Sequence, residues 1–186
     1  KYAVGPRKEM ATRTIFNLLG PLTNPANAKR QVMGVFHQKW VRPIAEVLKA
    51  LGSEHVMVVH SEDGLDEISI AASTYVAELK NGEILEYKIS PEDFGIPLQS
   101  TDTIQAFDAA ESLALIKTAL EGKGKVNPAR DIVALNAGAA IYVSGIADTL
   151  AEGVNIAEDV IGGGTAKVKM SELASFTRCF MSPDLL

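Results

Sequence analysis

Two short apolar segments that flank one amphipathic helix constrain the fold of this chain more than any other feature. Residues 31–36 and 55–60 are mostly apolar and bounded by polar residues, which is typical of strands buried on both faces of a parallel sheet. Residues 40–51 between them have helical spacing, and Gly52 follows where a glycine commonly ends a helix. This order predicts a right-handed βαβ unit and therefore an α/β fold.

Turn and cap signals place the remaining elements. Asn81-Gly82 separates residues 74–79 from residues 84–89 and predicts a β-hairpin. Three or four helices are expected after residue 107, because Asp108 and Asn127 are good N-caps. One of these helices has an apolar stripe at Leu150, Val154, Ala157 and Ile161, and a last helix is expected over residues 165–174.

The composition is that of an ordinary globular protein. The 186 residues are 47% hydrophobic and 22% charged, which suits one domain with a sizeable core. The net charge of −5 offers no basic surface for nucleic acid or acidic lipids. No apolar run approaches the roughly 20 residues of a membrane span, and Cys179, the single cysteine, cannot form an internal disulfide. We therefore expect a cytoplasmic protein that binds neither nucleic acid nor membrane.

A short helix near the start of the chain has almost no polar face. Ile15, Phe16, Leu18 and Leu19 leave so little polar surface that we expect the helix to be buried all round, covered by something outside this sequence. Gly20 and Pro21 are expected to end it, because glycine tolerates the left-handed conformation and proline cannot continue a helix.

The run that contains this helix resembles a known family. Residues 13–25 read RTIFNLLGPLTNP and follow Arg7, Lys8 and Glu9, and this run is similar to the signature of the anthranilate phosphoribosyltransferases. Residues 60–69 (HSEDGLDEIS) resemble the acidic metal-binding loop of the same family. The resemblance covers essentially the whole chain. It implies a mostly parallel sheet wrapped by helices, as in the large domain of the anthranilate phosphoribosyltransferase or nucleoside phosphorylase-like fold.

Asp66 and Glu67 are the candidate metal ligands. On a tight loop after Gly64, both carboxylates can reach one centre, and hard oxygen ligands suit Mg²⁺. The residues alone are also compatible with a solvated acidic loop, since Glu62 and Asp63 lie beside the pair. The resemblance favours the metal site, because the Asp-Glu pair of the family binds magnesium near the pyrophosphate.

Arg7, Gly20 and Pro21 are the candidate substrate-binding residues. The guanidinium of Arg7 offers a planar bidentate fork for a carboxylate, and the resemblance implies that it binds anthranilate. Backbone at Gly20 and Pro21 can come close to a flat aromatic ring, in addition to ending the helix. Arg13 is expected to be structural.

Several other features carry no predicted chemistry. Gly162-Gly163-Gly164 follows a helix instead of a strand, so it is interpreted as a helix stop and not as a phosphate loop. The three histidines show no ligand spacing, although His60 lies next to the acidic loop. Cys179 has no evident base partner.

The resemblance implies an enzyme of tryptophan biosynthesis. It would transfer the phosphoribosyl group from 5-phosphoribosyl-1-pyrophosphate to the nitrogen of anthranilate, use Mg²⁺, and act as a homodimer. Residues 1–186 would be the large α/β domain, with residues 1–30 as an interdomain helix and loop. No glycine-rich loop here follows a strand and opens a helix, and the helical N-terminal domain of the family is not found in this sequence. We therefore expect the 186 residues alone to be inactive.

Two alternative functions remain open. A pyrimidine nucleoside phosphorylase-like glycosyltransferase shares the architecture and also reacts at a ribose anomeric carbon, but residues 13–25 disfavour it. A non-enzymatic relative that binds nucleic acid should have a basic face, and the net charge of −5 argues against one.

Overall fold

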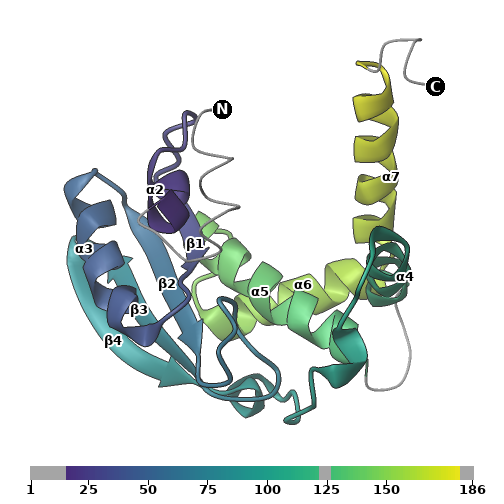
Figure 1. Cartoon of the computed structure of the whole chain (residues 1–186), viewed down its shortest axis with the longest axis horizontal. Coiled ribbons are helices and arrows are strands. Elements are labelled where there is room, and N and C mark those ends of the chain that lie inside the picture. Colours follow the sequence, from purple (N-terminus) through teal and green to yellow (C-terminus); the bar gives the residue numbers. More distant parts are fainter. Residues whose placement is uncertain (1–15, 122–126, 181–186) are drawn as a thin grey trace, which may run out of the picture.

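The computed structural model describes residues 16–121 and 127–180, so the predictions for Arg7 and Arg13 lie outside the described residues. One sheet lies between two helical layers (Figure 1). Helix α3 (Val41–Ala50) packs on one face, and helices α5 (Pro128–Ser144) and α6 (Leu150–Gly162) lie on the other side. The α/β class predicted from the sequence is confirmed.

The predicted βαβ unit is present as strand β1 (Arg30–Gly34), helix α3 and strand β2 (His55–Ser61). The two strands pair in parallel, from Arg30 opposite His55 to Gly34 opposite Val59. A 3-10 turn over Gln38–Trp40 leads into α3, and Gly52 ends it with a φ of 81°. Because β1 and β2 are parallel, their carboxyl ends lie at the same edge of the sheet.

The prediction of a mostly parallel sheet is wrong for the strands that the structure describes. The order is β1-β2-β3-β4, and only the β1–β2 pair is parallel. Strand β3 (Thr74–Lys80) runs antiparallel to both β2 and β4 (Glu83–Ile89). The predicted hairpin accounts for the β3–β4 pair, because Asn81 and Gly82 have φ values of 53° and 79° and reverse the chain in two residues. The sheet is therefore mixed.

Strand β2 is buried on both faces because a core lies on each side of it. Val56 and Val58 face α3, in a cluster with Ile44 and Leu48. The alternate residues of β2 face α5, in a second cluster of apolar side chains that includes Met57, Val59, Ile68, Ile70, Leu135, Tyr142 and Val154. The two clusters explain why the sequence of this strand shows no polar alternation.

Helices α5 and α6 approach each other so closely that two glycines are required. A Cβ added at Gly138 would lie 2.6 Å from the Cα of Val154, and one added at Gly153 would lie 2.3 Å from the carbonyl oxygen of Gly138. The missing side chains at Gly138 and Gly153 therefore allow the close packing of the two helices. The apolar stripe of α6 is confirmed, since Val154, Ala157 and Ile161 are buried.

The ends of the other helices follow the predicted caps in most cases. Asp108 accepts a hydrogen bond from the backbone N–H of Glu111 at the start of α4 (Ala109–Ala119), and Asn127 caps α5. Short 3-10 turns lie at Pro91–Phe94 and Asp102–Ile104. No helix in the described ranges is long and apolar enough to cross a membrane.

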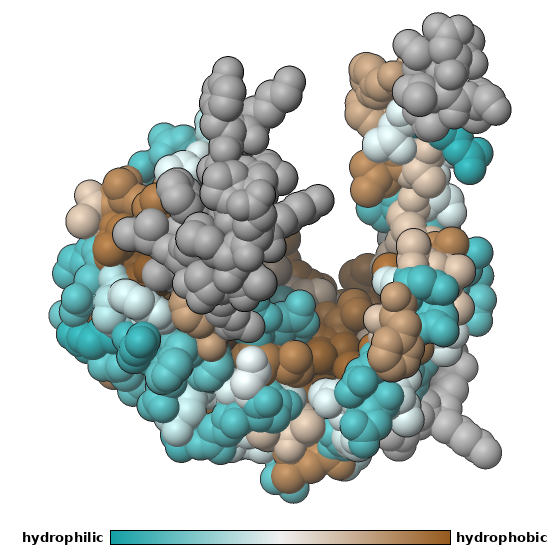
Figure 2. All heavy atoms as spheres, in the orientation of Figure 1, coloured by the Kyte–Doolittle hydropathy of each residue, from teal (hydrophilic) through white to brown (hydrophobic). Residues whose placement is uncertain are grey.

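Helix α7 (Thr165–Arg178) is longer than predicted and projects from the body of the molecule (Figure 1). It contains no buried residue. Brown apolar patches mark its surface in Figure 2, and the exposed large apolar side chains on it are Val168, Leu173 and Phe176, with Phe180 just beyond its end.

Helix α2 (Phe16–Leu22) differs from its prediction in where it ends. It continues through Gly20 and Pro21 to Leu22, and the hydroxyl of Thr23 then donates to the carbonyls of Leu19 and Gly20. Pro21 therefore lies inside the last turn of the helix, and the prediction that Gly20 and Pro21 end it is wrong. Leu19 is 37% exposed within this chain, so the cover expected from outside this sequence stays a prediction.

Candidate functional site

The acidic loop follows β2 and lies at the carboxyl ends of both parallel strands, where ligands of open α/β sheets usually bind. Ile68 and Ile70 anchor the loop, because both side chains are fully buried in the core against α5. The two residues just before Ile68 are Asp66 and Glu67. The loop therefore holds the predicted metal ligands next to a rigid attachment point.

Gly34, the last residue of β1, makes room for this loop. A Cβ added at Gly34 would lie 1.5 Å from the carbonyl oxygen of Asp66, so any other residue would push the loop away. From the sequence, Gly34 is expected only as part of an apolar strand. A glycine within an apolar strand was the available signal, because it often marks a close approach of another backbone.

Hydrogen bonds within the loop fix its turn. Asp63 accepts a hydrogen bond of 2.5 Å from the hydroxyl of Ser69 and one of 3.2 Å from the backbone N–H of Leu65. Partial burial alone would raise the pKa of Asp63, but these hydrogen bonds outweigh that effect and lower its pKa below the ordinary value. Asp63 is therefore a structural residue of the loop.

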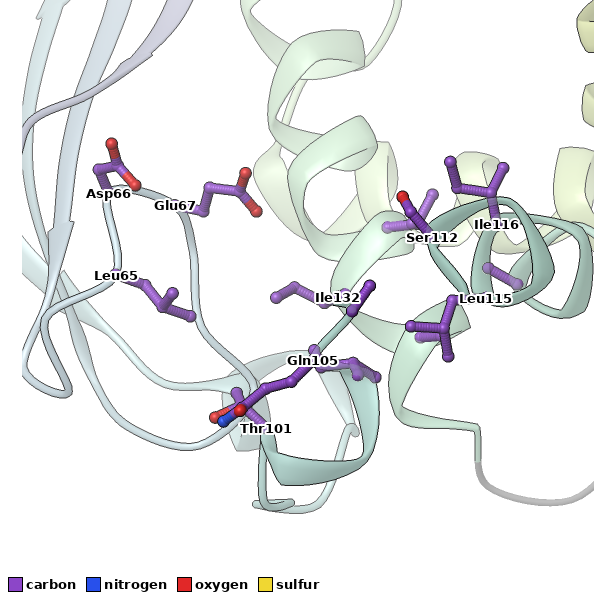
Figure 3. A pocket seen from close by; sticks show the side chains of 14 residues that line it. Leu65, Asp66, Glu67, Thr101, Gln105, Ser112, Leu115, Ile116 and Ile132 are labelled. Atoms are coloured by element: carbon purple, nitrogen blue, oxygen red, sulfur yellow. The ribbon is translucent and has the colours of Figure 1, made fainter. Parts of the chain in front are cut away.

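The carboxylates of Asp66 and Glu67 have a different environment. Both side chains are exposed, and within the described part of the chain neither makes a hydrogen bond or an ion pair. Both line two adjoining cavities of about 390 and 500 Å³, between the loop and α5. In Figure 3, Glu67 turns toward the helices, and Ile132 of α5 lies across the cavity from it. These carboxylates are thus available to a ligand.

The donor set of this loop fits Mg²⁺. Mg²⁺ usually keeps several waters and is bound by one or two carboxylates together with phosphate oxygens of the substrate. Asp66 and Glu67 supply two hard oxygen donors that no other described group neutralises. Within residues 16–121 and 127–180, no group of three or more His, Cys, Asp or Glu could hold a metal. The loop therefore resembles a site shared between protein and substrate, and not a closed metal site.

The two described candidates for substrate binding lie elsewhere on the chain. Gly20 and Pro21 are both on α2 and both exposed. Pro21 lines a small cavity of about 40 Å³ with residues of β1 and α3, and this cavity shares no residue with those at the acidic loop.

The remaining candidates have structural surroundings. The ring Nδ1 of His60 donates to the carbonyl of Val35 at 2.8 Å, and the ring stacks with His37. Cys179 is free and exposed. Gly162-Gly163-Gly164 joins α6 to α7, as its interpretation as a helix stop predicts.

A buried carboxylate that sequence analysis did not single out lies away from the acidic loop, toward the amino end of β2. Glu78 on β3 accepts hydrogen bonds from His55 Nε2 at 2.8 Å, Tyr142 at 2.7 Å and Tyr87 at 2.9 Å. Burial alone would raise the pKa of Glu78, but the three donors outweigh it and hold that pKa below its ordinary value. Burial, with the Glu78 charge nearby, also raises the pKa of Tyr87. This cluster ties β2, β3 and β4 to α5.

The sheet, the acidic loop and the adjoining cavities together indicate a class of protein. An open acidic loop at the carboxyl ends of two parallel strands, beside a cavity, is typical of an α/β domain that binds a small ligand at that edge of its sheet. The chain belongs to a glycosyl transferase family, since the model of that family's a/b domain matches residues 1–167.

Individual relatives of the chain have a more specific activity in their names than the family description has. The chain is 95% identical, over all 186 residues, to an anthranilate phosphoribosyltransferase of Marinomonas sp. (strain MWYL1), of which it covers 54%. It is 58% identical over 183 residues to an anthranilate phosphoribosyltransferase of Marinobacter nauticus, of which it covers 53%. The chain thus spans about half the length of these curated relatives.

Solved structures share the fold. The crystal structure of an anthranilate phosphoribosyltransferase from Thermus thermophilus matches with a TM-score of 0.82 at 39% identity, over 94% of this chain and 51% of that one. A Saccharomyces cerevisiae anthranilate phosphoribosyltransferase, solved in complex with PRPP and Mg, matches with a TM-score of 0.77 at 24% identity, over 89% of this chain and 47% of that one. The nucleoside phosphorylase-like fold implied by the sequence resemblance is therefore confirmed.

Proposed function

We propose that this chain is part of an anthranilate phosphoribosyltransferase. The complete enzyme would transfer the phosphoribosyl group of 5-phosphoribosyl-1-pyrophosphate to the nitrogen of anthranilate, a step of tryptophan biosynthesis. The observation that carries the proposal is the 95% identity to such an enzyme along the entire chain. The open acidic loop supports it, because a pyrophosphate leaving group needs a nearby cation.

In this proposal, Asp66 and Glu67 hold Mg²⁺ against the pyrophosphate. When bound, Mg²⁺ supplies the positive charge that stabilises the departing pyrophosphate. Gly34 and the buried Ile68 and Ile70 keep the two carboxylates at the strand edge, and the substrate phosphates complete the donor set. Catalysis then depends on positioning and electrostatics, without a strong general acid.

The acceptor is assigned to the segment before β1. We propose that Arg7 pairs with the carboxylate of anthranilate through its bidentate fork and that the backbone at Gly20 and Pro21 lies along the aromatic ring. The exposure of Gly20 and Pro21 leaves this backbone accessible.

The domain organisation, cellular location and oligomeric state of the complete enzyme are also proposals. Residues 1–186 would be its large α/β domain, with residues 1–30 as an interdomain helix and loop, and a helical domain and phosphate loops would come from the rest of the enzyme. We propose that it is cytoplasmic, in agreement with the single cysteine. We also propose a homodimer, which only the family resemblance implies.

The function is tested by assaying the complete enzyme for consumption of anthranilate, followed by its fluorescence. The expected result is turnover that requires 5-phosphoribosyl-1-pyrophosphate. The Arg7→Ala variant is expected to raise KM for anthranilate and to leave KM for the pyrophosphate substrate unchanged, since a lost charged hydrogen bond costs about 1.5–3 kcal/mol. Phosphorolysis of a pyrimidine nucleoside without anthranilate turnover would support the nucleoside phosphorylase alternative instead.

A separate prediction concerns the acidic loop as the proposed metal site. Asp66→Asn combined with Glu67→Gln keeps the shape of the loop but removes its two unpaired charges. The Mg²⁺ concentration that gives half-maximal activity is expected to rise by about tenfold or more, with no change in thermal stability. Activity titrated against Mg²⁺ measures the shift.

Glu62→Gln is the matched control for this prediction. It removes a carboxylate from the same loop, but one that pairs with Lys88 at 2.6 Å on the surface. Surface ion pairs contribute little to the stability of the fold. The Glu62→Gln control is therefore expected to keep the parental dependence of activity on Mg²⁺. A double variant with that same parental curve would return Asp66 and Glu67 to the solvated-loop interpretation.

A further inference from the structure

One side chain of α5 holds the backbone of the acidic loop directly beside Glu67. The Oδ1 atom of Asn136 accepts a hydrogen bond of 2.9 Å from the N–H of Ile68. Its Nδ2 atom donates to the carbonyl of Ile68 at 2.9 Å and to the carbonyl of Ile132, one turn earlier on α5, also at 2.9 Å. The amide therefore pairs with both backbone groups of one loop residue, as a neighbouring strand would.

The chemistry of this contact requires an amide. The N–H of Ile68 can only donate and its carbonyl can only accept, so the partner must present an acceptor and a donor side by side. Aspartate lacks the donor, and leucine, of similar size, lacks both groups. The bond to Ile132 further fixes the amide in its orientation, since it uses the second hydrogen of Nδ2.

Asn136 acts from the side opposite to Gly34. Gly34 lets the backbone of Asp66 lie against the end of β1. Asn136 holds the backbone of Ile68, two residues further on, against α5. Both residues line the 500 Å³ cavity together with Asp66 and Glu67. The two carboxylates thus lie on a short backbone segment that is held at each end.

We propose that Asn136 is a positioning residue for the metal site: its amide sets the place of Asp66 and Glu67 and thereby the affinity for the divalent cation. This proposal rests on the proposed function of the acidic loop. Asn136 contacts neither the metal nor the substrate in this role. Residues that orient metal ligands typically change metal affinity by about 10–100-fold when they are lost, so the effect is measurable.

The test measures cation binding directly in the complete enzyme. Mn²⁺ is titrated in the presence of 5-phosphoribosyl-1-pyrophosphate, and the free ion is followed by its electron paramagnetic resonance signal, well below the melting temperature. Asn136→Leu is expected to weaken Mn²⁺ binding by about 10–100-fold, with KM for anthranilate unchanged. Asn136→Ser, which adds no bulk and keeps only a short hydroxyl, covers the case in which the leucine variant does not fold, and its expected shift has the same direction.

Asn155→Leu is the matched control, because Asn155 is an exposed residue of the neighbouring helix α6. It is expected to bind Mn²⁺ like the parent. A folded Asn136 variant with parental Mn²⁺ affinity would overturn the proposal, even if its melting temperature were lower, because Asn136 would then only stabilise the fold. Parental Mn²⁺ affinity in the Asp66→Asn, Glu67→Gln variant would overturn the metal site itself, so the two failures are distinguishable.

Discussion

Replacing Glu78 by alanine is expected to destabilise the complete enzyme by about 3–5 kcal/mol, as measured by urea unfolding followed by circular dichroism. The substitution removes the acceptor for His55, Tyr87 and Tyr142 and leaves three donors unpaired inside the protein. Unpaired buried donors lose their bonds to water without compensation. A loss below about 1 kcal/mol would show that the cluster contributes little to stability.

Glu78→Gln separates the charge from the hydrogen bonds. It keeps an acceptor oxygen and the shape of the side chain, so the expected destabilisation is smaller. Because the pKa of Glu78 is below its ordinary value of 4.5 in the folded protein, its charge stabilises the fold above about pH 4.5, and this contribution is lost as the pH falls through the lower folded-state pKa. The difference in unfolding free energy between parent and Glu78→Gln should therefore shrink below about pH 4.5. A difference that grows toward acid pH would contradict the lowered pKa.

Gly153→Val is expected to be as damaging, because it forces α5 and α6 apart. Even the Cβ atom would lie 2.3 Å from the carbonyl oxygen of Gly138, which is backbone and cannot rotate away. Overpacking of a core typically costs about 1–3 kcal/mol and sometimes more, and we expect the upper end of this range, measured by the same urea titration.

Gly162→Ala on the same helix is the control for this steric effect. A Cβ added at Gly162 would meet no atom within 4 Å, and alanine favours a helix over glycine by up to about 1 kcal/mol. The control should be neutral or slightly stabilising. Equal losses in both variants would mean that the destabilisation does not come from the close contact of Gly153 with α5.

The sequence predicted those parts of the fold that have a local signal. The apolar runs of β1 and β2, the Asn81-Gly82 turn and the cap at Asn127 each lie within a few residues of the structure that they specify. Placement of the acidic loop after β2 followed from the same patterns. The identity of its ligands could be argued only from the family resemblance, because a pair of adjacent acids is common on solvated loops.

The parts that could not be predicted depend on residues far apart in the chain. Asn136 pairs with Ile68, 68 positions away, and Tyr142 pairs with Glu78, 64 positions away. No periodicity connects such positions, and Asn136 within a helix looks like an ordinary polar residue. The error at α2 has a different cause, because a proline in the last turn of a short helix removes one donor and does not end the helix.

Helix α5 combines three of these contacts within two turns, at Asn136 on the acidic loop, Gly138 on α6 and Tyr142 on Glu78. A displacement of the helix along its axis would therefore move the acidic loop, the contact between α5 and α6, and the buried carboxylate of Glu78 together. Substitutions in the three contacts should combine non-additively, because they share one rigid backbone. The effect on metal affinity that we propose for Asn136 is consequently constrained by stability, so compensating substitutions are to be sought in α6 and β3 as much as at the acidic loop itself.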